Sequence, residues 1–380
     1  MKVSKRLIAA ACGLGVAVSL IGVSVANADP TPLPGNARPL QGVGSDTTEE
    51  VMNGMSEVIV DGSNNKLISS WNAKGSAGFQ TRPSGCNYIG NNGESAYVEG
   101  RRANGSGAGQ QALRDAFTTG KTTFGCLDFA RSSSAASASN LGTVEVKGLA
   151  LATDSLTFAV NKQTAIPRKL TKQNLIDAYH CNFGGFTTGA WKALIPQAGS
   201  GTRSTWLGKV GLTEGDLTNP ANLPCVTDQA DLGTRGGSNP LQEHDLRTLN
   251  GTSIAPVSVA QWVSMMGGGV DSDLRGSSML GTITASSGEL SYPISLNTSY
   301  GNLAGTADDF AATRTVFNVV PTSILTGGAN ANPTAISVFE DTDPAAGTNT
   351  SMLCNRTDVL AKYGFAPIAT CGTGSIVNPQ

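Results

Sequence analysis

Residues 198–203 read Ala-Gly-Ser-Gly-Thr-Arg, and an amphipathic pattern follows them directly. Two similar stretches lie earlier in the chain: residues 42–47 read Gly-Val-Gly-Ser-Asp-Thr, and residues 104–109 read Asn-Gly-Ser-Gly-Ala-Gly. Each precedes a predicted helix, whose first turn has unpaired N–H groups and a partial positive charge. Glycine lets a ligand approach the backbone closely, and serine or threonine adds a hydroxyl donor. Together, the three loops predict a site for a small oxyanion.

Taken singly, each loop is more typical of a capped helix that follows a turn. Their joint occurrence favours an anion site, because such sites are commonly built from several helix N-termini. The Gly-Lys-Thr at residues 120–122 is not a P-loop, since Asp115 stands where its first glycine belongs, and no loop has the G-x-S-x-G of a nucleophile elbow. We interpret His180 as packing near a disulfide and His244 as part of a solvated polar loop. The sequence therefore predicts neither an enzyme nor a cofactor.

The N-terminus has the three regions of a secretory signal peptide, which we place at residues 1–28. Basic residues precede an almost wholly apolar run at residues 7–25, and Ala-Asn-Ala at residues 26–28 fits a cleavage site. A retained membrane anchor is the alternative, because the apolar run is about as long as a short span. The Pro-rich sequence that follows favours cleavage. We expect a secreted or periplasmic mature chain that starts at Asp29, with an extended leader over residues 29–40.

Size and charge indicate the number of lobes and argue against one class of ligand, the nucleic acids. A mature chain of roughly 350 residues suggests two lobes rather than one core. Charged residues make up only 14% of the 380-residue sequence, and the formal net charge is −2. Without a basic run there is no case for nucleic-acid binding. An anion would have to be held by local dipoles rather than by the overall charge of the protein.

The cysteines are expected to form three disulfides. One of the seven, Cys12, lies in the signal peptide, and an even number in an exported chain favours disulfides, although the sequence does not fix which cysteines pair. We predict that nearest neighbours in the sequence pair, because each pair then stays within one lobe. A metal site is the weaker alternative, since no C-x-x-C occurs. The six residues are Cys86, Cys126, Cys181, Cys225, Cys354 and Cys371.

Strand-like and helix-like stretches alternate along the chain, which predicts an α/β fold. Four helices are expected from their apolar periodicity: residues 47–59, residues 107–117, and the stretches that open at Thr171 and Thr202. Asp46 and Glu49 are spaced as a capping box for the first helix, and Ser106 is placed as a cap for the second.

Several segments, in order, resemble the phosphate-type solute-binding proteins of ABC transporters. The most specific match is residues 196–203, which resemble the R-x-x-G-S-G-T-R of that family. The loop at residues 104–109 resembles its G-S-G-G loop, and residues 127–133 (Leu-Asp-Phe-Ala-Arg-Ser-Ser) resemble its D-F-G-A-S-D segment. Residues 170–179 are similar to its L-T-x-x-x-L-x-D-x-Y helix, and Tyr-Pro-Ile at residues 292–294 is similar to the strand that returns to the first lobe.

Two departures from the family pattern concern the ligand. Pro196 stands where the family has an arginine, and Ser133 stands where it has an aspartate that accepts the proton of phosphate and repels fully ionised anions. A serine forms hydrogen bonds but does not select by charge. Arg131 and Arg203 are the candidates to restore the positive charge. Selectivity for phosphate is therefore less firmly predicted than oxyanion binding.

The resemblance implies two α/β lobes joined by hinge strands, a periplasmic-binding-protein-like fold that closes around its ligand. Lobe 1 would comprise residues 41–156 and, with a C-terminal extension, residues 292–380; lobe 2 would comprise residues 157–291. The implied function is capture of phosphate or a phosphate-bearing solute by a monomer, for an ABC permease. A sensing or adhesion module on the same scaffold and a phosphatase are the alternatives. The candidate ligand-binding residues are Ser45, Asp46, Thr47, Ser106, Gly107, Arg131, Ser133, Ser200, Gly201, Thr202 and Arg203.

Overall fold

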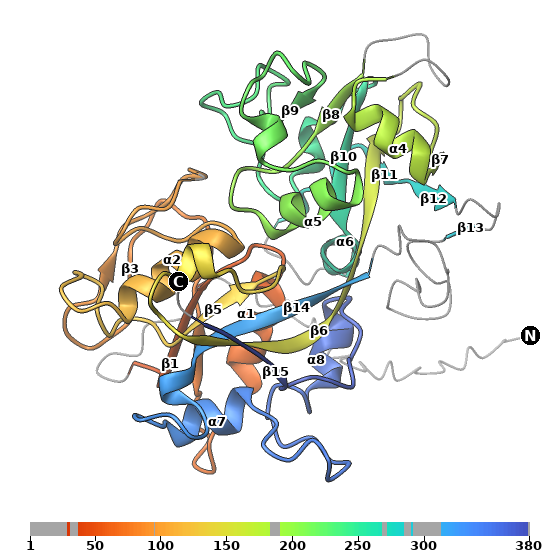
Figure 1. Cartoon of the computed structure of the whole chain (residues 1–380). Helices are drawn as coiled ribbons and strands as arrows, with labels where there is room; N and C mark the ends of the chain where they lie inside the picture. The colour runs from red at the N-terminus through yellow and green to blue at the C-terminus, as the bar shows by residue number, and fades with distance from the viewer. Residues whose placement is uncertain are drawn as a thin grey trace, which may run out of the picture.

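The computed structural model describes residues 29–30, 37–94, 96–182, 191–267, 272–284, 290–291 and 313–378. The predicted signal peptide, residues 31–36 of the predicted leader and the Tyr-Pro-Ile segment at residues 292–294 lie outside the described residues. Leu40, the last residue of the predicted leader, is the first residue of strand β1. Figure 1 shows two groups of helices and strands, with one long strand running from the first into the second. Within the described ranges, no helix is both long and apolar enough to cross a membrane.

The main sheet continues from one lobe into the other in the order β2-β1-β5-β14-β6-β10-β8-β9. Its strands are β1 (Leu40–Gly44), β2 (Ile68–Ser70), β5 (Phe129–Ser132), β6 (Val146–Asn161), β8 (Lys192–Leu194), β9 (Val226–Thr227), β10 (Ser253–Ser258) and β14 (Thr313–Pro321), with β11 (Ser278–Leu280) and β15 (Gly374–Val377) also paired to β6. The β1–β5 and β8–β10 pairs are parallel, whereas β14 and β10 run antiparallel to β6.

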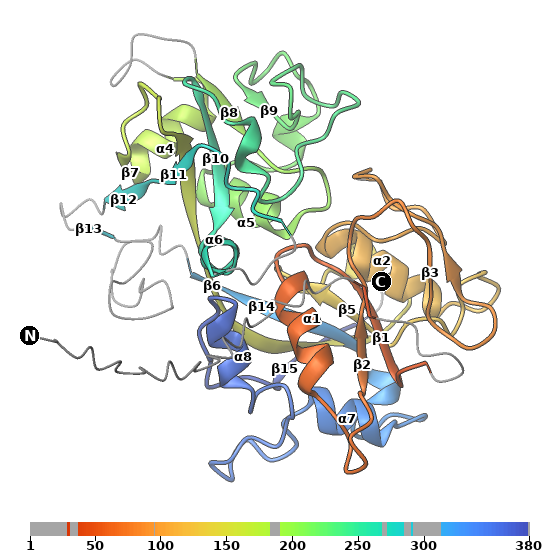
Figure 2. The same ribbon diagram turned by 180° about the vertical axis from the view of Figure 1, so that it is seen from behind.

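Strand β6 changes partners halfway along its length. Its first part, from Val146 to Ser155, pairs with β14, and its second part, from Leu156 onward, pairs with β10. Figure 2 shows the same strand leaving the lobe that contains α1 and entering the one that contains α4. We propose that the lobes divide at this change of partner. The second proposed boundary, after residue 291, lies at the edge of the described residues.

Each lobe has helices packed on its part of the sheet. In lobe 1, α1, α7 and α8 share a buried apolar cluster with β6 and β14, while α2 packs on β1 and β5 through a separate cluster. In lobe 2, α4 and α5 enclose Tyr179, Trp206 and Phe158, all fully buried. The helices are α1 (Glu49–Val58), α2 (Ser106–Ala116), α3 (Ala138–Leu141), α4 (Lys172–Tyr179), α5 (Gly201–Lys209), α6 (Val259–Met266), α7 (Pro333–Phe339) and α8 (Thr357–Lys362).

The remaining elements are short. They are the strand pair β3 (Phe79–Gln80) and β4 (Asn87–Tyr88), the small sheet of β7 (Lys169–Thr171), β12 (Thr282–Thr284) and β13 (Leu290–Ser291), and 3-10 turns at Gly215–Leu217, Leu246–Thr248 and Thr322–Ile324. The alternation of strands and helices on this sheet is the α/β fold that the sequence predicts.

The start of α1 differs from the prediction. The expected capping box is not formed: α1 begins at Glu49, and the side chain of its N-cap, Thr48, makes no capping hydrogen bond. The Glu49 carboxylate instead accepts a hydrogen bond from the Ala73 amide and lies 3.5 Å from Arg131. Because the Glu49 carboxylate points toward Arg131 and Ala73, it is not available to cap its own helix. A tertiary contact thus replaces the local capping box.

The other helix starts follow the sequence more closely. Ser106 is the first residue of α2 rather than its cap; the cap is Gly105, whose φ of 107° suits glycine. Thr171, where a helix is predicted to open, caps α4 in a capping box with Asn174. Ser200 caps α5 by accepting a hydrogen bond from the amide of Arg203 at 3.0 Å.

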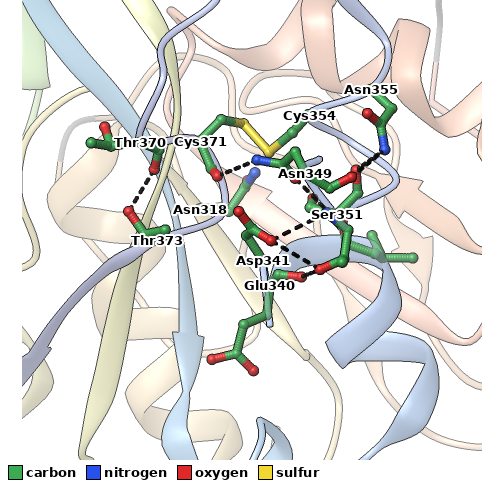
Figure 3. The surroundings of a disulfide bond; sticks show 12 residues. Asn318, Glu340, Asp341, Asn349, Ser351, Cys354, Asn355, Thr370, Cys371 and Thr373 are labelled. Carbon is green, nitrogen blue, oxygen red and sulfur yellow. Dashed lines mark hydrogen bonds between the residues drawn. A yellow bond between two sulfur atoms is a disulfide. The ribbon is translucent and has the colours of Figure 1, made fainter. Parts of the chain in front are cut away.

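The predicted pairing of nearest-neighbour cysteines is confirmed, and each disulfide stays within one lobe. The pairs are Cys86–Cys126, Cys181–Cys225 and Cys354–Cys371. Figure 3 shows the third, beside which the Asn349 side chain donates a hydrogen bond of 2.8 Å to the Cys371 carbonyl. A disulfide in a native fold typically contributes about 2–4 kcal/mol. This one fastens the segment that leads into β15 on the long strand β6.

Candidate functional site

The structure brings the three glycine-rich loops together where the lobes meet. The Gly107 amide, at the start of α2 in lobe 1, donates a hydrogen bond of 3.1 Å to the Gly199 carbonyl in lobe 2. A Cβ atom at Gly201 would lie only 2.2 Å from the Ser133 hydroxyl oxygen and 2.6 Å from that of Ser106. Glycine is therefore required at residue 201, because any side chain there would push the two lobes apart.

Three serines of lobe 1 form a hydroxyl cluster that faces Gly201. The Ser45 hydroxyl donates to the Ser133 hydroxyl at 3.1 Å, and the hydroxyls of Ser106 and Ser133 lie 3.2 Å apart. The Ser133 amide also donates to the Ser106 hydroxyl at 2.9 Å. All three side chains are buried. Since a hydroxyl can donate or accept, the cluster can turn its protons toward an anion without a change of charge.

A second cluster lies beside the serines and contains charged groups from both lobes. The Thr47 hydroxyl of lobe 1 donates to Glu243 Oε1 at 3.1 Å, and the Thr202 amide at the N-terminus of α5 donates to the same oxygen at 3.0 Å. Arg314 Nη2 donates to the Thr202 hydroxyl at 2.9 Å and to the Thr47 hydroxyl at 3.3 Å. A guanidinium and a carboxylate thus face the same two threonines.

Arg314 is held in place by the strands that connect the lobes. It lies opposite Asp154 in the β14–β6 register, and its Nε and Nη2 donate to Asp154 Oδ2 at 3.0 and 2.9 Å. Asp154 is itself fixed by the Ser258 hydroxyl at 2.8 Å. The remaining nitrogen of Arg314, Nη1, is buried and has no hydrogen-bond partner in the described part of the chain. Buried donors are rarely left unpaired, so Nη1 is suited to a ligand oxygen.

His244 is buried and not solvated, which corrects the prediction of a polar surface loop. Only 4% of His244 is exposed, and its neighbour Glu243 is fully buried. The His244 ring nitrogen Nε2 lies 3.2 Å from the Thr47 hydroxyl, and Gln261 donates to the Thr47 carbonyl at 2.6 Å. Burial lowers the pKa of His244 below its ordinary value. The loop is polar because its partners lie across the lobe interface.

Arg131 lies behind the first loop, with its donors already in use. Its Nη1 donates to the Ser70 hydroxyl and the Trp71 carbonyl, each at 2.8 Å, and its Nε donates to the Ser45 carbonyl at 3.2 Å. With Glu49 at 3.5 Å, these contacts support the loop from within lobe 1. Arg131 therefore positions Ser45 rather than offering a free donor to a ligand.

Arg203 is engaged by two carboxylates of its own lobe. Its Nε and Nη2 donate to Glu214 at 2.8 and 2.7 Å, and its Nη1 donates to Asp228 at 3.1 Å. The other charged residue of the three loops, Asp46, lies 3.7 Å from Lys74. Of the arginines considered, Arg314 is the one whose donors reach the hydroxyls of the loops.

Asp46, Glu243 and His244 each offer one ligand atom, and these atoms lie within 4.8 Å of one another. Two carboxylates and an imidazole are a donor set that suits a transition metal. However, Lys74 already pairs with Asp46, and His244 Nδ1 lies 3.5 Å from the N–H of Ser258. A metal-bound histidine normally donates from its second nitrogen to an acceptor, the reverse of this arrangement. We therefore assign no metal to these residues.

A pocket of about 380 Å³ adjoins the charged cluster. Glu243 and His244 line it together with the cations Lys74 and Arg247 and with acidic residues of α1 and its N-terminal loop. The charged cluster thus borders a polar pocket where the two lobes meet.

Sequence reasoning missed four residues of this site: Arg314, Asp154, Glu243 and His244. Arg314 and Asp154 are 160 positions apart and meet only through the register of β14 on β6. Glu243 and His244 carry one local signal, their adjacent ionisable side chains, but a polar loop at the surface has the same composition. Their burial depends on contacts between the lobes, which no short motif encodes.

No protein-family model matches this sequence, and no curated protein matches it. Among solved structures, the fold is similar to a Clostridium perfringens protein described as a phosphate ABC transporter substrate-binding protein with bound phosphate. The TM-score is 0.50 at 14% identity over 87% of this chain and 99% of that chain. This likeness supports the two-lobed periplasmic-binding-protein-like fold.

Two other structures are less similar. An ABC-type phosphate transport receptor from Vibrio cholerae has a TM-score of 0.46 at 16% identity, over 86% of this chain and 99% of that chain. A phosphate-binding protein from Stenotrophomonas maltophilia has a TM-score of 0.45 at 13% identity, over 87% and 91%. At such identities a likeness concerns the fold alone.

Proposed function

We propose that this protein captures phosphate or a phosphate-bearing small solute between its two lobes and passes it to an ABC-type permease. One observation supports the proposal most strongly. Hydroxyl groups from both lobes converge in a buried seam, and they meet an arginine with an unpaired donor: Ser45, Thr47, Ser106, Ser133, Thr202 and Arg314.

The chemistry of these groups suits an anion. Ser45, Ser106 and Ser133 are neutral donors, and the first turns of α2 and α5 add backbone N–H groups with a partial positive charge. Arg314 supplies the full positive charge that Pro196 does not. A hydrogen bond to a charged group typically contributes about 1.5–3 kcal/mol. A few such bonds are enough for micromolar binding, even after the cost of association.

The strands that connect the lobes suggest how the ligand enters. In the structure the hydroxyls contact one another, so an anion of phosphate size needs the lobes to separate before it binds. Strands β6 and β14 pass from one lobe toward the other and carry Asp154 and Arg314 at the change of partner. Rotation about these strands would open the seam while Arg314 stays near the hinge axis.

The proposed setting is outside the cytoplasm. The predicted signal peptide and the three disulfides both favour an oxidising compartment, either the periplasm or the cell exterior. Delivery to a permease, the monomeric state and the lack of enzymatic activity belong to the same proposal.

Calorimetry tests the proposal directly. The mature protein is freed of ligand in denaturant with its disulfides intact, refolded, and titrated with phosphate, sulfate, a sugar phosphate and, as a control, a neutral sugar. We expect saturable binding of phosphate or the sugar phosphate and none of the neutral sugar. A folded, ligand-free sample that binds none of the anions would contradict the proposal.

A further inference from the structure

Glu243 occupies the place that an anion takes at a helix N-terminus. Its Oε1 accepts the hydrogen bond of the Thr202 amide, in the first turn of the nine-residue helix α5. The same oxygen accepts the hydroxyl of Thr47, which belongs to the other lobe. Amides in the first turn have no partner within the helix, and the helix dipole favours a negative charge there. The carboxylate thus bridges the two lobes by using donors that suit an oxyanion.

The burial of this carboxylate indicates that the seam favours a negative charge at the N-terminus of α5. Glu243 is fully buried, and its second oxygen, Oε2, has no hydrogen-bond partner in the part of the chain that the structure describes. Burial would raise the pKa of Glu243, yet the field of His244 and the bond from Thr202 lower the pKa below its ordinary value. An ionised carboxylate survives burial only where charges and donors compensate it.

Arg314 is part of that compensation, but Glu243 is not its main partner. Asp154 already takes Nε and Nη2 of Arg314, so Glu243 adds a second negative charge near a single guanidinium. The seam therefore contains one carboxylate that holds Arg314 in position and another that sits on the helix end. The second can leave without releasing the arginine.

We propose that Glu243 is a tethered anion: it closes the empty cleft by taking donors of both lobes, and the bound oxyanion displaces it. The inference rests on the proposed function for the identity of the incoming ligand. The displaced side chain has a place to go, because Glu243 already lines the pocket that contains Lys74 and Arg247. Both cations are already paired there, Lys74 with Asp46 at 3.7 Å and Arg247 with Asp245 at 2.7 Å, so the displaced carboxylate would join two existing ion pairs.

This arrangement makes two linked claims. The empty protein is closed because an internal carboxylate bridges the lobes, and external anions bind less tightly than the donor set allows because they compete with it. Removing the carboxylate should open the empty cleft and strengthen anion binding, two effects that a purely structural glutamate would not combine.

The experiment compares Glu243→Ala and Glu243→Gln with a matched control, Glu214→Ala. Glu214 lies in the same lobe, has an exposed side chain and pairs with Arg203 rather than with the groups that Glu243 contacts. Glu243→Gln keeps the shape of the side chain and an acceptor for the Thr202 amide, so it guards against a variant that fails to fold. Small-angle X-ray scattering of the ligand-free proteins reports opening, and calorimetry with inorganic phosphate reports affinity.

We expect ligand-free Glu243→Ala to have a larger radius of gyration than the wild type and the control, and to become compact when phosphate is added. Its phosphate affinity should rise about tenfold or more, the effect of losing one strong competing contact, with a smaller rise in Glu243→Gln. Unchanged compactness with unchanged or weaker affinity would overturn the inference and leave the proposed function standing. If Glu243→Ala opens but no protein binds phosphate, the closing role stands and the proposed function fails.

Discussion

Arg131 and Arg314 are both buried beside the loops, yet they do different work. Arg131 donates to the Ser45 and Trp71 carbonyls within lobe 1, where its charge supports the backbone of the first loop. Arg314 is clamped by one carboxylate, reaches hydroxyls of both lobes and keeps one nitrogen without a partner. Proximity in sequence to a ligand loop therefore does not tell which arginine serves the ligand. The decisive feature is whether nearby acceptors already use its donors.

The largest expected effect on phosphate affinity comes from replacing each of these two arginines in turn. Arg314→Gln should weaken phosphate binding by about tenfold to more than a hundredfold, because it removes a charged hydrogen-bond donor from the seam. Arg131→Gln should lower the melting temperature instead, because the buried carbonyls of Ser45 and Trp71 lose their donor, at a cost of about 1–3 kcal/mol each. Calorimetry on the folded fraction of each variant measures affinity, and circular dichroism measures melting. Equal losses of affinity in both variants would remove the distinction between the two arginines.

The sequence predicts those features of the fold and the site that depend on residues close together in the chain. The glycine-rich loops, the helix that opens at Thr171 and the nearest-neighbour disulfides follow from short patterns, and the structure has them. Arg314 could not be found this way, because its role depends on strand register with Asp154 over 160 positions. Glu243 could not be found either, because its burial depends on contact with Thr47 of the other lobe.

A smaller effect separates two serines of the loops. Ser106→Ala should reduce phosphate affinity by about tenfold, because its hydroxyl belongs to the cluster that faces Gly201. Ser200→Ala should mainly lower the free energy of unfolding, by about 1 kcal/mol, because its hydroxyl caps α5. Urea unfolding and phosphate titration of both variants check the pair. A loss of stability without loss of affinity in Ser106→Ala would mean that this hydroxyl only supports the fold, through its bonds to Ser133.

The smallest effect concerns the pH dependence of the Arg131 region. Burial, followed by repulsion from Asp46, raises the pKa of Glu49 from its ordinary value of 4.5 to about 7. Between these values the unfolded chain has released a proton that the folded chain still holds, so the stabilising contribution of Glu49 is present below pH 4.5 and is lost as the pH rises toward 7. Its largest slope would be about 1.4 kcal/mol per pH unit.

Glu49→Gln should remove this contribution. Urea unfolding of the wild type and the variant between about pH 5 and pH 7 should show wild-type stability falling relative to the variant as the pH increases. Parallel pH profiles would mean that Glu49 is ionised in the folded protein and forms a full ion pair with Arg131.

The central claim is that an oxyanion binds between Arg314 and the hydroxyls of both lobes. A crystal structure of the mature protein grown with phosphate tests it most directly. The account predicts density for the anion within hydrogen-bond distance of Arg314 Nη1 and of hydroxyls from both lobes, Ser106 and Thr202 among them. Density that lies away from Arg314, or lobes that bind phosphate only at their outer surfaces, would contradict it.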